Sequence, residues 1–542
     1  MEVITTVYIF EVMVLENIFI TSDRWVRVSE GNSTIWFTGY LEVDGGTYDR
    51  TNIRDYFKTH SFRPSAVTEW RGEFAIVLKD ETKIFAAVDR KRSIPLFYYR
   101  DDHDRWIVTD HLGRDLVKRN LNDTSVFEFI ITGYVSNEKT LVKDILQLEP
   151  GQYLVIENNQ VSVTSYFQFF HQVDEALDEA SGVEELKKIF YRVFERLAKR
   201  IAGQSVMIPL SGGYDSRIIA LMLKEFDVKP IRSFSYGKPG NQEAQVSKEI
   251  AERLGIPWEF YTYSKADWFK WYHSQDWESY VEQASNLTSI GHLQDWPAVK
   301  QMMERYEDSF VFIPGHAGDF IAGSHIPYDL TIDRTFELDE VVHQIMRKHH
   351  RLWDTPDQQV KSLIISEIKD SLQGFPFQNR EQASAAFEYW DWKERQAKFI
   401  TNSVRVYEFF GQDWQIPLWD DEIVDFFLKV PVELRYRKYL YDLTLHQMYP
   451  DYFSHPTKEL SSSMFKWKQG PIHKILRRGY TTKLVFQQYF SDPMNWFGIT
   501  GSYIDYLRET RFRYKHVPFS LPYNINSIIV KDYIEKLIGR SQ

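Results

Sequence analysis

Residues 205–216 read Ser205-Val-Met-Ile-Pro-Leu-Ser-Gly-Gly-Tyr-Asp-Ser216. The apolar run Ser205–Leu210 is typical of a buried strand, and the apolar stretch Arg217–Leu223 after the turn is typical of a helix. A glycine-rich turn from a strand into a helix presents backbone N–H groups at the helix N-terminus, where they bind phosphate groups well. This stretch therefore predicts one strand–loop–helix unit of a parallel α/β sheet, with a phosphate-binding loop at Ser211–Ser216.

The predicted loop has the residue types that a phosphate site needs. Gly212 and Gly213 let the backbone approach an anion, and Ser211 and Ser216 add hydroxyl donors. Asp215 would repel a phosphate in direct contact, so we expect a Mg²⁺ ion between the two. The loop has no lysine and so differs from the Gly-Lys-Ser/Thr phosphate loop. The alternative is a tight strand–helix turn that binds no ligand.

Two further predicted strands also end in glycine-containing loops. Pro230–Tyr236 ends at Gly237, and Ser309–Ile313 is followed by Pro314-Gly-His-Ala-Gly-Asp319. In an open parallel sheet the carboxyl ends of the strands line the ligand crevice. We therefore expect the three loops to meet, with Asp319 beside Asp215 at the Mg²⁺ ion.

The character of the sequence changes along the chain. Up to about residue 170 the segments are short, β-rich and bounded by turns, for example Glu73–Leu78, Lys83–Val88 and Gln152–Ile156. A predicted helix over 183–202 opens a part in which strands and helices alternate, as in a parallel sheet. From about Phe336 onward the chain is mainly helical in pattern and rich in aromatic residues.

Composition excludes several classes of function. The net charge of -11 argues against general binding to nucleic acids or anionic membranes. The absence of cysteine excludes disulfides, thiolate nucleophiles and cysteine metal sites. The apolar start Met1–Ile20 is interrupted by glutamates and lacks a basic n-region, so it predicts strands and not a signal peptide. No uncharged run reaches the ~18 residues of a membrane helix. We expect a cytoplasmic protein without membrane insertion.

Nearly the whole chain resembles the asparagine synthetase family. Four motifs in the second part carry the resemblance: Ser211–Ser216, Ser233–Gly237, Gly315-His-Ala-Gly-Asp319 and Ile416-Pro-Leu-Trp-Asp420. In the first part the order and spacing of Trp70–Ala75, Asp89-Arg90, Pro95–Tyr99, Thr132–Val135 and Leu148–Tyr153 are similar to the family's glutaminase domain. The resemblance implies an α/β fold of two domains. Residues 1–172 would form an αββα domain of the N-terminal-nucleophile type, and residues 173–542 a PP-loop synthetase domain with a helical C-terminal part.

The resemblance also implies a site for ATP and Mg²⁺. Asp215 and Asp319 would hold the Mg²⁺ ion. Lys458, eight residues after Pro450, would be the family's catalytic lysine, which stabilises the adenylate and the later tetrahedral intermediate. The residues implied for nucleotide binding are Leu210, Ser211, Gly212, Gly213, Asp215, Ser216, Ser235, Tyr236, Gly237 and Gly315.

The chain departs from the family at the glutaminase site. A glutaminase of this type needs a cysteine at its mature N-terminus, and this chain has no cysteine at any position. The family's Asn-Gly-Glu strand reads Thr38-Gly39-Tyr40, and its Arg-Gly-Pro-Asp segment is missing. We therefore predict that the N-terminal domain does not hydrolyse glutamine and serves a structural role.

The nitrogen must then come from ammonia or from an amine on a substrate, as in the similar β-lactam synthetases and lasso-peptide cyclases. An attacking amine needs a base. His316 occupies the position in the second glycine loop where β-lactam-forming relatives have a tyrosine, and Asp413 lies four residues before Pro417. A histidine held by a carboxylate is a competent base. The alternative is that His316 only fills the loop while Asp413 makes a local cap.

These features predict an ATP-dependent ligase that adenylates a carboxylate and forms an amide without a glutaminase. Lasso-peptide or other lactam cyclisation, amidation in polysaccharide synthesis and ammonia-dependent asparagine synthesis remain open, as does a regulatory nucleotide-binding protein without turnover. The expected partner is a small-molecule or peptide substrate that carries the carboxylate and the amine. A homodimer and a partner protein that delivers the substrate also remain open.

Overall fold

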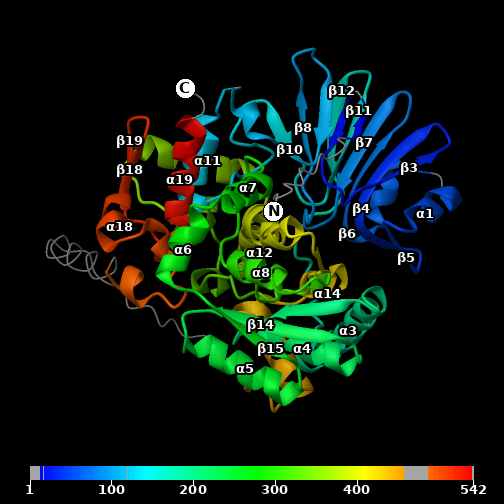
Figure 1. Cartoon of the computed structure of the whole chain (residues 1–542). Helices are drawn as coiled ribbons and strands as arrows, with labels where there is room; N and C mark the ends of the chain where they lie inside the picture. The colour runs from blue at the N-terminus through cyan, green and yellow to red at the C-terminus, as the bar shows by residue number, and fades with distance from the viewer. Residues whose placement is uncertain (1–12, 16, 61, 119, 457–485, 540–542) are drawn as a thin grey trace, which may run out of the picture.

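A computed structural model describes residues 13–15, 17–60, 62–118, 120–456 and 486–539. A β-rich N-terminal region, blue in Figure 1, stands beside an α/β region whose parallel sheet and flanking helices lie at the bottom of the view. Helices of the C-terminal part, yellow to red, fill the centre and the opposite side. The predicted α/β class with these two parts is confirmed. The predicted boundary after residue 172 falls in the segment between β12 (Gln160–Ser165) and α3 (Glu179–Arg200) and stays a prediction.

The N-terminal region contains two sheets that pack face to face. One has the strand order β1-β2-β9-β8-β10, and the other has the order β12-β11-β7-β6-β4-β3, with β5 paired to β4. All pairs in them are antiparallel except β2 with β9. The strands are β1 (Met13–Leu15), β2 (Ile18–Ile20), β3 (Val26–Glu30), β4 (Ser33–Val43), β5 (Gly46–Asp49), β6 (Arg71–Lys79), β7 (Lys83–Val88), β8 (Phe97–Arg100), β9 (Trp106–Thr109), β10 (Ile145–Gln147) and β11 (Gln152–Glu157).

Alternation along the strands divides the apolar residues between two layers. On β4, Ile35 and Phe37 face helix α1 (Ile53–Thr59) and share a small core with its Tyr56. Trp36, between them in sequence, points to the opposite face and joins the main core, which also contains Phe97 of the other sheet. Helix α2 (Asp123–Thr132) contributes its buried face to the same main core. This arrangement matches the predicted αββα layering.

The parallel sheet has the strand order β15-β14-β13-β16-β17, and every neighbouring pair in it is parallel. Its central strand, β13 (Ser205–Pro209), is the strand predicted from the sequence. The other strands are β14 (Ile231–Gly237), β15 (Trp258–Thr262), β16 (Phe310–Phe312) and β17 (Asp413–Trp414). Helices α4 (Tyr214–Glu225) and α5 (Gln242–Leu254) connect the first three strands, and Gly255 ends α5 in the left-handed conformation, as its position in the sequence predicts.

Helix α3 begins four residues earlier than predicted. The Asp178 carboxylate accepts a hydrogen bond from the Ser181 N–H, and the Asp178 N–H donates one to the Ser181 hydroxyl oxygen, so a capping box fixes the start at Glu179. The buried positions of α3, which include Leu186, Phe190 and Leu197, repeat at helical spacing. They anchor the helix in the main core.

The C-terminal part is mainly helical, as predicted. One long helical run crosses the molecule from Arg380 to Phe409: α12 (Arg380–Asp391), the π-helix η4 (Trp392–Ile400), the 3₁₀ turn η5 (Thr401–Val404) and α13 (Arg405–Phe409). Within the described ranges no helix combines the length and the apolarity that crossing a bilayer requires. The other helices of this part and of the region before it are α6 (Lys265–Tyr272), α7 (Gln275–Ser285), α8 (Trp296–Met303), α9 (Gly318–Ile321), α10 (Leu338–His349), α11 (Gln358–Ser371), α14 (Asp421–Phe427), α15 (Val432–Arg435), α16 (Tyr439–Met448), α18 (Tyr503–Glu509) and α19 (Ile525–Gly539), with the hairpin β18 (Arg511–Tyr514) and β19 (Val517–Ser520).

Candidate active site

A cavity of 610 Å³ opens at the carboxyl ends of β13, β14 and β16, where the three glycine-containing loops were expected to meet. Two of the loops contribute most of its polar floor, and the long helical run from Arg380 contributes the facing wall. The polar and glycine residues that line the cavity include Ser211, Gly213, Asp215, Ser216, Tyr236, His292, Asp295, Gly315, His316, Asp319, Arg395, Ser403 and Lys438.

The loop after β13 leaves its helix N-terminus open. Gly213 is the N-cap of α4, and no side chain caps its first N–H groups. The hydroxyl of Ser216 accepts a hydrogen bond from the Ser211 N–H at 3.0 Å, and the Ser211 hydroxyl accepts one from the Gly213 N–H at 3.1 Å. These bonds fix the shape of the loop while Ser211 and Gly213 stay exposed. An uncapped helix N-terminus beside exposed N–H groups is suited to an anion such as pyrophosphate.

Two glycines let the loop after β16 lie directly against this one. A Cβ at Gly315 would be 2.8 Å from the Ser216 nitrogen, and a Cβ at Gly318 would be 3.0 Å from an Asp215 carboxylate oxygen. Real Cβ atoms essentially never come as close as 2.8 Å to backbone and seldom as close as 3.0 Å to another atom, so a larger residue at either position would press on the other loop. The close fit allows the Asp319 N–H to donate a hydrogen bond of 3.0 Å to Oδ2 of Asp215. The predicted meeting of Asp215 and Asp319 is thus present in the structure.

The two carboxylates suit a divalent cation. Asp215 accepts a hydrogen bond from the Tyr441 hydroxyl at 3.0 Å, and burial together with the charge of Asp319 raises the pKa of Asp215 to about 7. Asp319 has a half-exposed side chain that accepts a hydrogen bond from the Ser324 hydroxyl at 3.2 Å. Among the described residues no cluster of three or more carboxylate or histidine side chains could enclose a metal by itself. Two carboxylates beside a phosphate site are the usual protein contribution for Mg²⁺.

Two cations in the cavity wall were missed by the sequence reasoning. Lys438 follows Arg437 with both backbones in the left-handed region, at φ values of 59° and 57°. Its ammonium lies 5.2 Å from the centre of the Tyr214 ring, pairs with Asp442 at 3.2 Å, and its charge lowers the pKa of Asp215 against the raising effects.

Arg395, on the π-helix η4, is the second cation. Its guanidinium forms no ion pair with any residue in the described ranges, and it lines the cavity. Both cations lie about two hundred residues from the phosphate loop in the chain. No local pattern marks them, because lysines and arginines of helical segments are usually solvated.

His316 lies in the cavity with one nitrogen committed to a neighbour. Its Nε2 is 2.7 Å from the hydroxyl of Ser403, and that hydroxyl donates its only proton to the Ile400 carbonyl at 2.6 Å. The Ser403 oxygen must then accept from Nε2–H, which assigns the proton to Nε2 and leaves Nδ1 as the basic nitrogen. Burial lowers the pKa of His316 to about 4, so the imidazole is neutral near pH 7.

The expected pairing of His316 with Asp413 is wrong. Asp413 begins β17, at the opposite end of the sheet from the cavity, because β17 runs parallel to β16. Its carboxylate accepts a hydrogen bond of 2.7 Å from Arg24 and another of 3.3 Å from Arg50. The short spacing between Asp413 and Pro417 predicted that Asp413 lies near the His316 loop. Spacing alone could not show that Asp413 starts strand β17, which carries the chain away from that side chain before Pro417 is reached. In the structure Ser403 takes the place beside His316 that was assigned to Asp413.

The remaining predicted residues divide into cavity-lining and supporting groups. Tyr236 lines the cavity and donates a hydrogen bond of 2.5 Å to Asp295, which also accepts one of 2.6 Å from Tyr407. The buried Ser235 hydroxyl instead donates to the Leu210 carbonyl at 2.6 Å and ties two strands together. Leu210, Gly212, Ser235 and Gly237 do not line the cavity. Lys458 lies outside the described residues.

Comparison with known proteins identifies both parts of the chain. The family model for asparagine synthase matches residues 195–494, which is more than half of the chain, and the glutamine amidotransferase domain model matches residues 58–167. A search of curated proteins returned no match.

Similar solved structures are distant. The glutamine phosphoribosylpyrophosphate amidotransferase of B. subtilis, complexed with ADP and GMP, is 12% identical and covers 43% of this chain and 71% of its own, with a TM-score of 0.18. The U34-tRNA thiolase NcsA of Methanococcus maripaludis, with its [4Fe-4S] cluster, is 13% identical and covers 61% and 79%, with a TM-score of 0.21. Similarity this low supports no argument about activity. The synthase match, which spans the phosphate loop and the wall of the cavity, is the informative one: the chain belongs to the asparagine synthase family and is an ATP-dependent carbon–nitrogen ligase.

Proposed function

We propose that this chain adenylates a substrate carboxylate with ATP, releases pyrophosphate, and then joins the acyl group to an amine without using glutamine. The observation that supports this most strongly is the contact between the loops after β13 and β16, where the Asp319 N–H binds Asp215 beside an uncapped helix N-terminus. One loop offers N–H donors for pyrophosphate, and the two loops together offer a pair of carboxylates. A simple strand–helix turn would need neither.

ATP would lie across the strand ends with its pyrophosphate on the loop Ser211–Ser216. Exposed N–H groups of this loop and the ammonium of Lys438 provide positive potential for the phosphates. Asp215 and Asp319 would hold Mg²⁺, which supplies neutralisation of phosphate charge when bound. Tyr236 and Gly315 border the nucleoside, and Lys458 is the proposed lysine at the α-phosphate.

In the first step a carboxylate oxygen of the substrate attacks the α-phosphorus. The new O–P bond forms as the bond to the β-phosphate oxygen breaks, and pyrophosphate leaves. Negative charge accumulates on the departing pyrophosphate, so preorganised N–H donors and cations at its position lower the barrier. Arg395, whose guanidinium forms no ion pair with the described residues, lines the facing wall and is placed to attract the incoming carboxylate.

In the second step an amine nitrogen attacks the acyl carbonyl and AMP leaves with the former carboxylate oxygen. The nitrogen must lose a proton, and His316 is the proposed base, acting through Nδ1. Ser403 holds the imidazole in the required tautomer. The lowered pKa keeps His316 unprotonated near pH 7, and the same burial makes Nδ1 a weaker base than a free imidazole.

The amine is proposed to be ammonia or a group on the substrate, because a chain without cysteine has no nucleophile of the glutaminase type. Macrolactam or lactam cyclisation, including lasso-peptide cyclisation, and amidation of a sugar acid fit this chemistry. Ammonia-dependent asparagine synthesis also fits it.

The test is isotope transfer from the acid to AMP. Candidate acids labelled with ¹⁸O in the carboxylate would be incubated with Mg-ATP and ammonium or a primary amine: L-aspartate, peptides with aspartate or glutamate side chains, and uronic acids. We expect one acid to transfer a single ¹⁸O atom to AMP with release of pyrophosphate. Formation of ADP and phosphate would contradict the proposal. Tight binding of Mg-ATP without turnover of any acid would favour the regulatory alternative.

A further inference from the structure

The π-helix η4 has two faces with different neighbours. Arg395, Phe399 and Ile400 line the ATP cavity, and Ser403 of the following turn holds His316. The neighbouring residues Lys393, Glu394 and Lys398 do not line the cavity and instead join a buried network with the N-terminal region.

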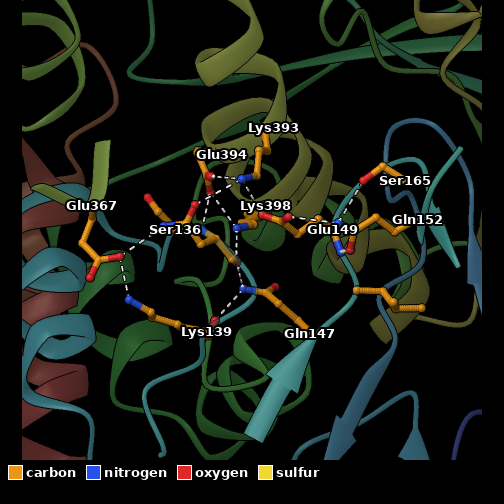
Figure 2. A network of polar contacts seen from close by, with 12 residues as sticks. Ser136, Lys139, Gln147, Glu149, Gln152, Ser165, Glu367, Lys393, Glu394 and Lys398 are labelled. Atoms are coloured by element: carbon orange, nitrogen blue, oxygen red, sulfur yellow. Dashed lines mark hydrogen bonds and ion pairs between the residues drawn. The ribbon is translucent and has the colours of Figure 1, made fainter. Parts of the chain in front are cut away.

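Figure 2 shows this network from close by. Lys393 forms an ion pair with a carboxylate oxygen of Glu149 at 2.9 Å and donates a hydrogen bond to the Asn137 side-chain oxygen at 3.1 Å. Glu394 accepts hydrogen bonds from the Asn137 N–H at 3.0 Å and from Lys398 at 2.6 Å, and Lys398 also donates to the Asn137 carbonyl at 2.5 Å. Asn137 of the N-terminal region thus contacts all three charged side chains on this face of the π-helix, and Glu149 pairs with one of them, Lys393.

The network is buried and balanced in charge. The side chains of Glu394 and Lys398 are fully buried, and those of Lys393 and Glu149 are 11% exposed. Burial alone would lower the pKa of Lys393, but the charges of Glu149 and Glu394 raise it above its usual value, so the ammonium stays charged. Removing one member of such a buried set leaves an uncompensated charge, which costs far more than losing a surface ion pair.

Other contacts hold the same helical run from the same side. Trp392 donates its indole N–H to the Arg90 carbonyl at 2.9 Å, and Arg405 donates to the Ser93 carbonyl. Gln152 supports Glu149 by donating to its second carboxylate oxygen at 3.1 Å. The amidotransferase-like region therefore contacts the run at Trp392, along η4 and at Arg405, while Arg395, Phe399, Ile400 and Ser403 of the same run line the cavity.

We propose that the amidotransferase-like region is a positioning element for the synthetase cavity, and that the ion pair between Glu149 and Lys393 sets the place of the Arg395–Ser403 wall. Glu149 and Asn137 act through the helix and do not touch substrate. This gives the region a present role that is independent of glutamine. The link to catalysis rests on the proposed function, whereas the link to the π-helix does not.

The experiment measures hydrogen exchange of the backbone amides in peptides that cover residues 392–404. It compares wild type, Glu149→Gln and the control Lys139→Met. Lys139 belongs to the same network, but its ammonium pairs with Glu367 of α11 at 2.6 Å and not with η4. In Glu149→Gln we expect exchange over 392–404 to speed up roughly 3- to 30-fold, with β13 and β14 unchanged. In Lys139→Met we expect less than about a twofold change in the same peptides.

Equal exchange of 392–404 in Glu149→Gln and in the control would overturn the proposal. If Glu149→Gln does not fold, the double variant Glu149→Gln/Lys393→Met removes the pair without leaving an unpaired charge, and the same prediction holds for it. A second arm adds α,β-methylene-ATP with Mg²⁺. In wild type the nucleotide should slow exchange over 392–404, and in the variant this protection should be smaller. Absence of nucleotide protection in wild type would count against the proposed function alone, since the first arm does not use the nucleotide.

Discussion

Two cavities of similar size, one between β4 and the α/β region and one at the carboxyl ends of the parallel strands, differ in how their polar groups are satisfied. The cavity beside Thr38, Gly39 and Tyr40 of β4 measures 660 Å³, and the synthetase cavity measures 610 Å³. In the first, Arg200 lies 4.1 Å from the centre of the Tyr40 ring and Arg24 pairs with Asp413 at 2.7 Å. In the second, the α4 N-terminus has no side-chain cap and Arg395 has no ion-pair partner within the described ranges.

We interpret the first cavity as part of a supporting interface and the second as the proposed binding site. Polar groups that bind their own neighbours stabilise the fold, whereas groups that lack a cap or an ion-pair partner among the described residues are available to a ligand. Tyr40 stands where the family has the glutamate of its Asn-Gly-Glu strand, and it now packs against a helix of the other region. The amidotransferase-like region thus has two packed sheets with apolar cores, and the part of β4 around Tyr40 contacts α3 of the other region. The following predictions would break or sharpen this contrast.

The largest effect is expected from the carboxylate pair. Asp319→Asn should lower AMP formation by about 10³-fold, since it weakens the electrostatic complement to the phosphates. Steady-state AMP production with saturating acid measures this. Asp413→Asn is the matched control in the other cavity and should leave AMP production within about twofold. If both variants lost activity equally, the two cavities would not differ as described.

A selective effect is expected at His316. His316→Ala should slow amide formation by about 10²-fold and leave acid-dependent ATP–pyrophosphate exchange near the wild-type rate, because the base acts only after adenylation. Ser403→Ala should give a smaller loss in the same step, since it frees the tautomer but keeps the base. Loss of both reactions in His316→Ala would show that the imidazole is needed earlier.

A moderate effect is expected from the glycine that lets the loops touch. Gly315→Ala places a methyl group 2.8 Å from the Ser216 nitrogen and should weaken binding of α,β-methylene-ATP by about 10-fold, measured by calorimetry. Gly539→Ala meets no atom within 4 Å and serves as the control. Unchanged affinity in Gly315→Ala would mean that nucleotide binding does not depend on the close fit.

The smallest effect on turnover is expected in the N-terminal region, where a buried acid should alter stability. Burial raises the pKa of Glu128 from 4.5 to about 7. Between these pH values the folded chain keeps a proton that the unfolded chain releases, so this group lowers the free energy of unfolding as the pH rises through that range. Glu128→Gln should therefore gain roughly 2–3 kcal/mol relative to wild type on going from pH 5 to pH 8, measured by denaturant unfolding. If the difference in unfolding free energy between Glu128→Gln and wild type were the same at pH 5 and pH 8, Glu128 would be ionised in the folded chain over this whole range.

The sequence predicted those features that depend on local pattern. The glycines that follow three apolar strands correctly predicted where the cavity lies. Asp215 and Asp319 lie together as expected, because parallel strands end at one edge of a sheet. The contributions of Lys438, Arg395 and Ser403 could not be predicted, since they come from helical segments whose packing depends on contacts far along the chain. Asp413 was misplaced for the related reason that spacing in sequence does not fix the end of the sheet at which a side chain lies.

The most direct test of the account is exchange of labelled pyrophosphate into ATP, measured with the acid found by isotope transfer. We predict exchange that requires the acid and Mg²⁺, proceeds without glutamine, and is lost in Asp319→Asn but retained in Asp413→Asn. Exchange that persists in Asp319→Asn, or consumption of ATP to ADP and phosphate by the wild type, would contradict the assignment of carboxylate adenylation to this cavity.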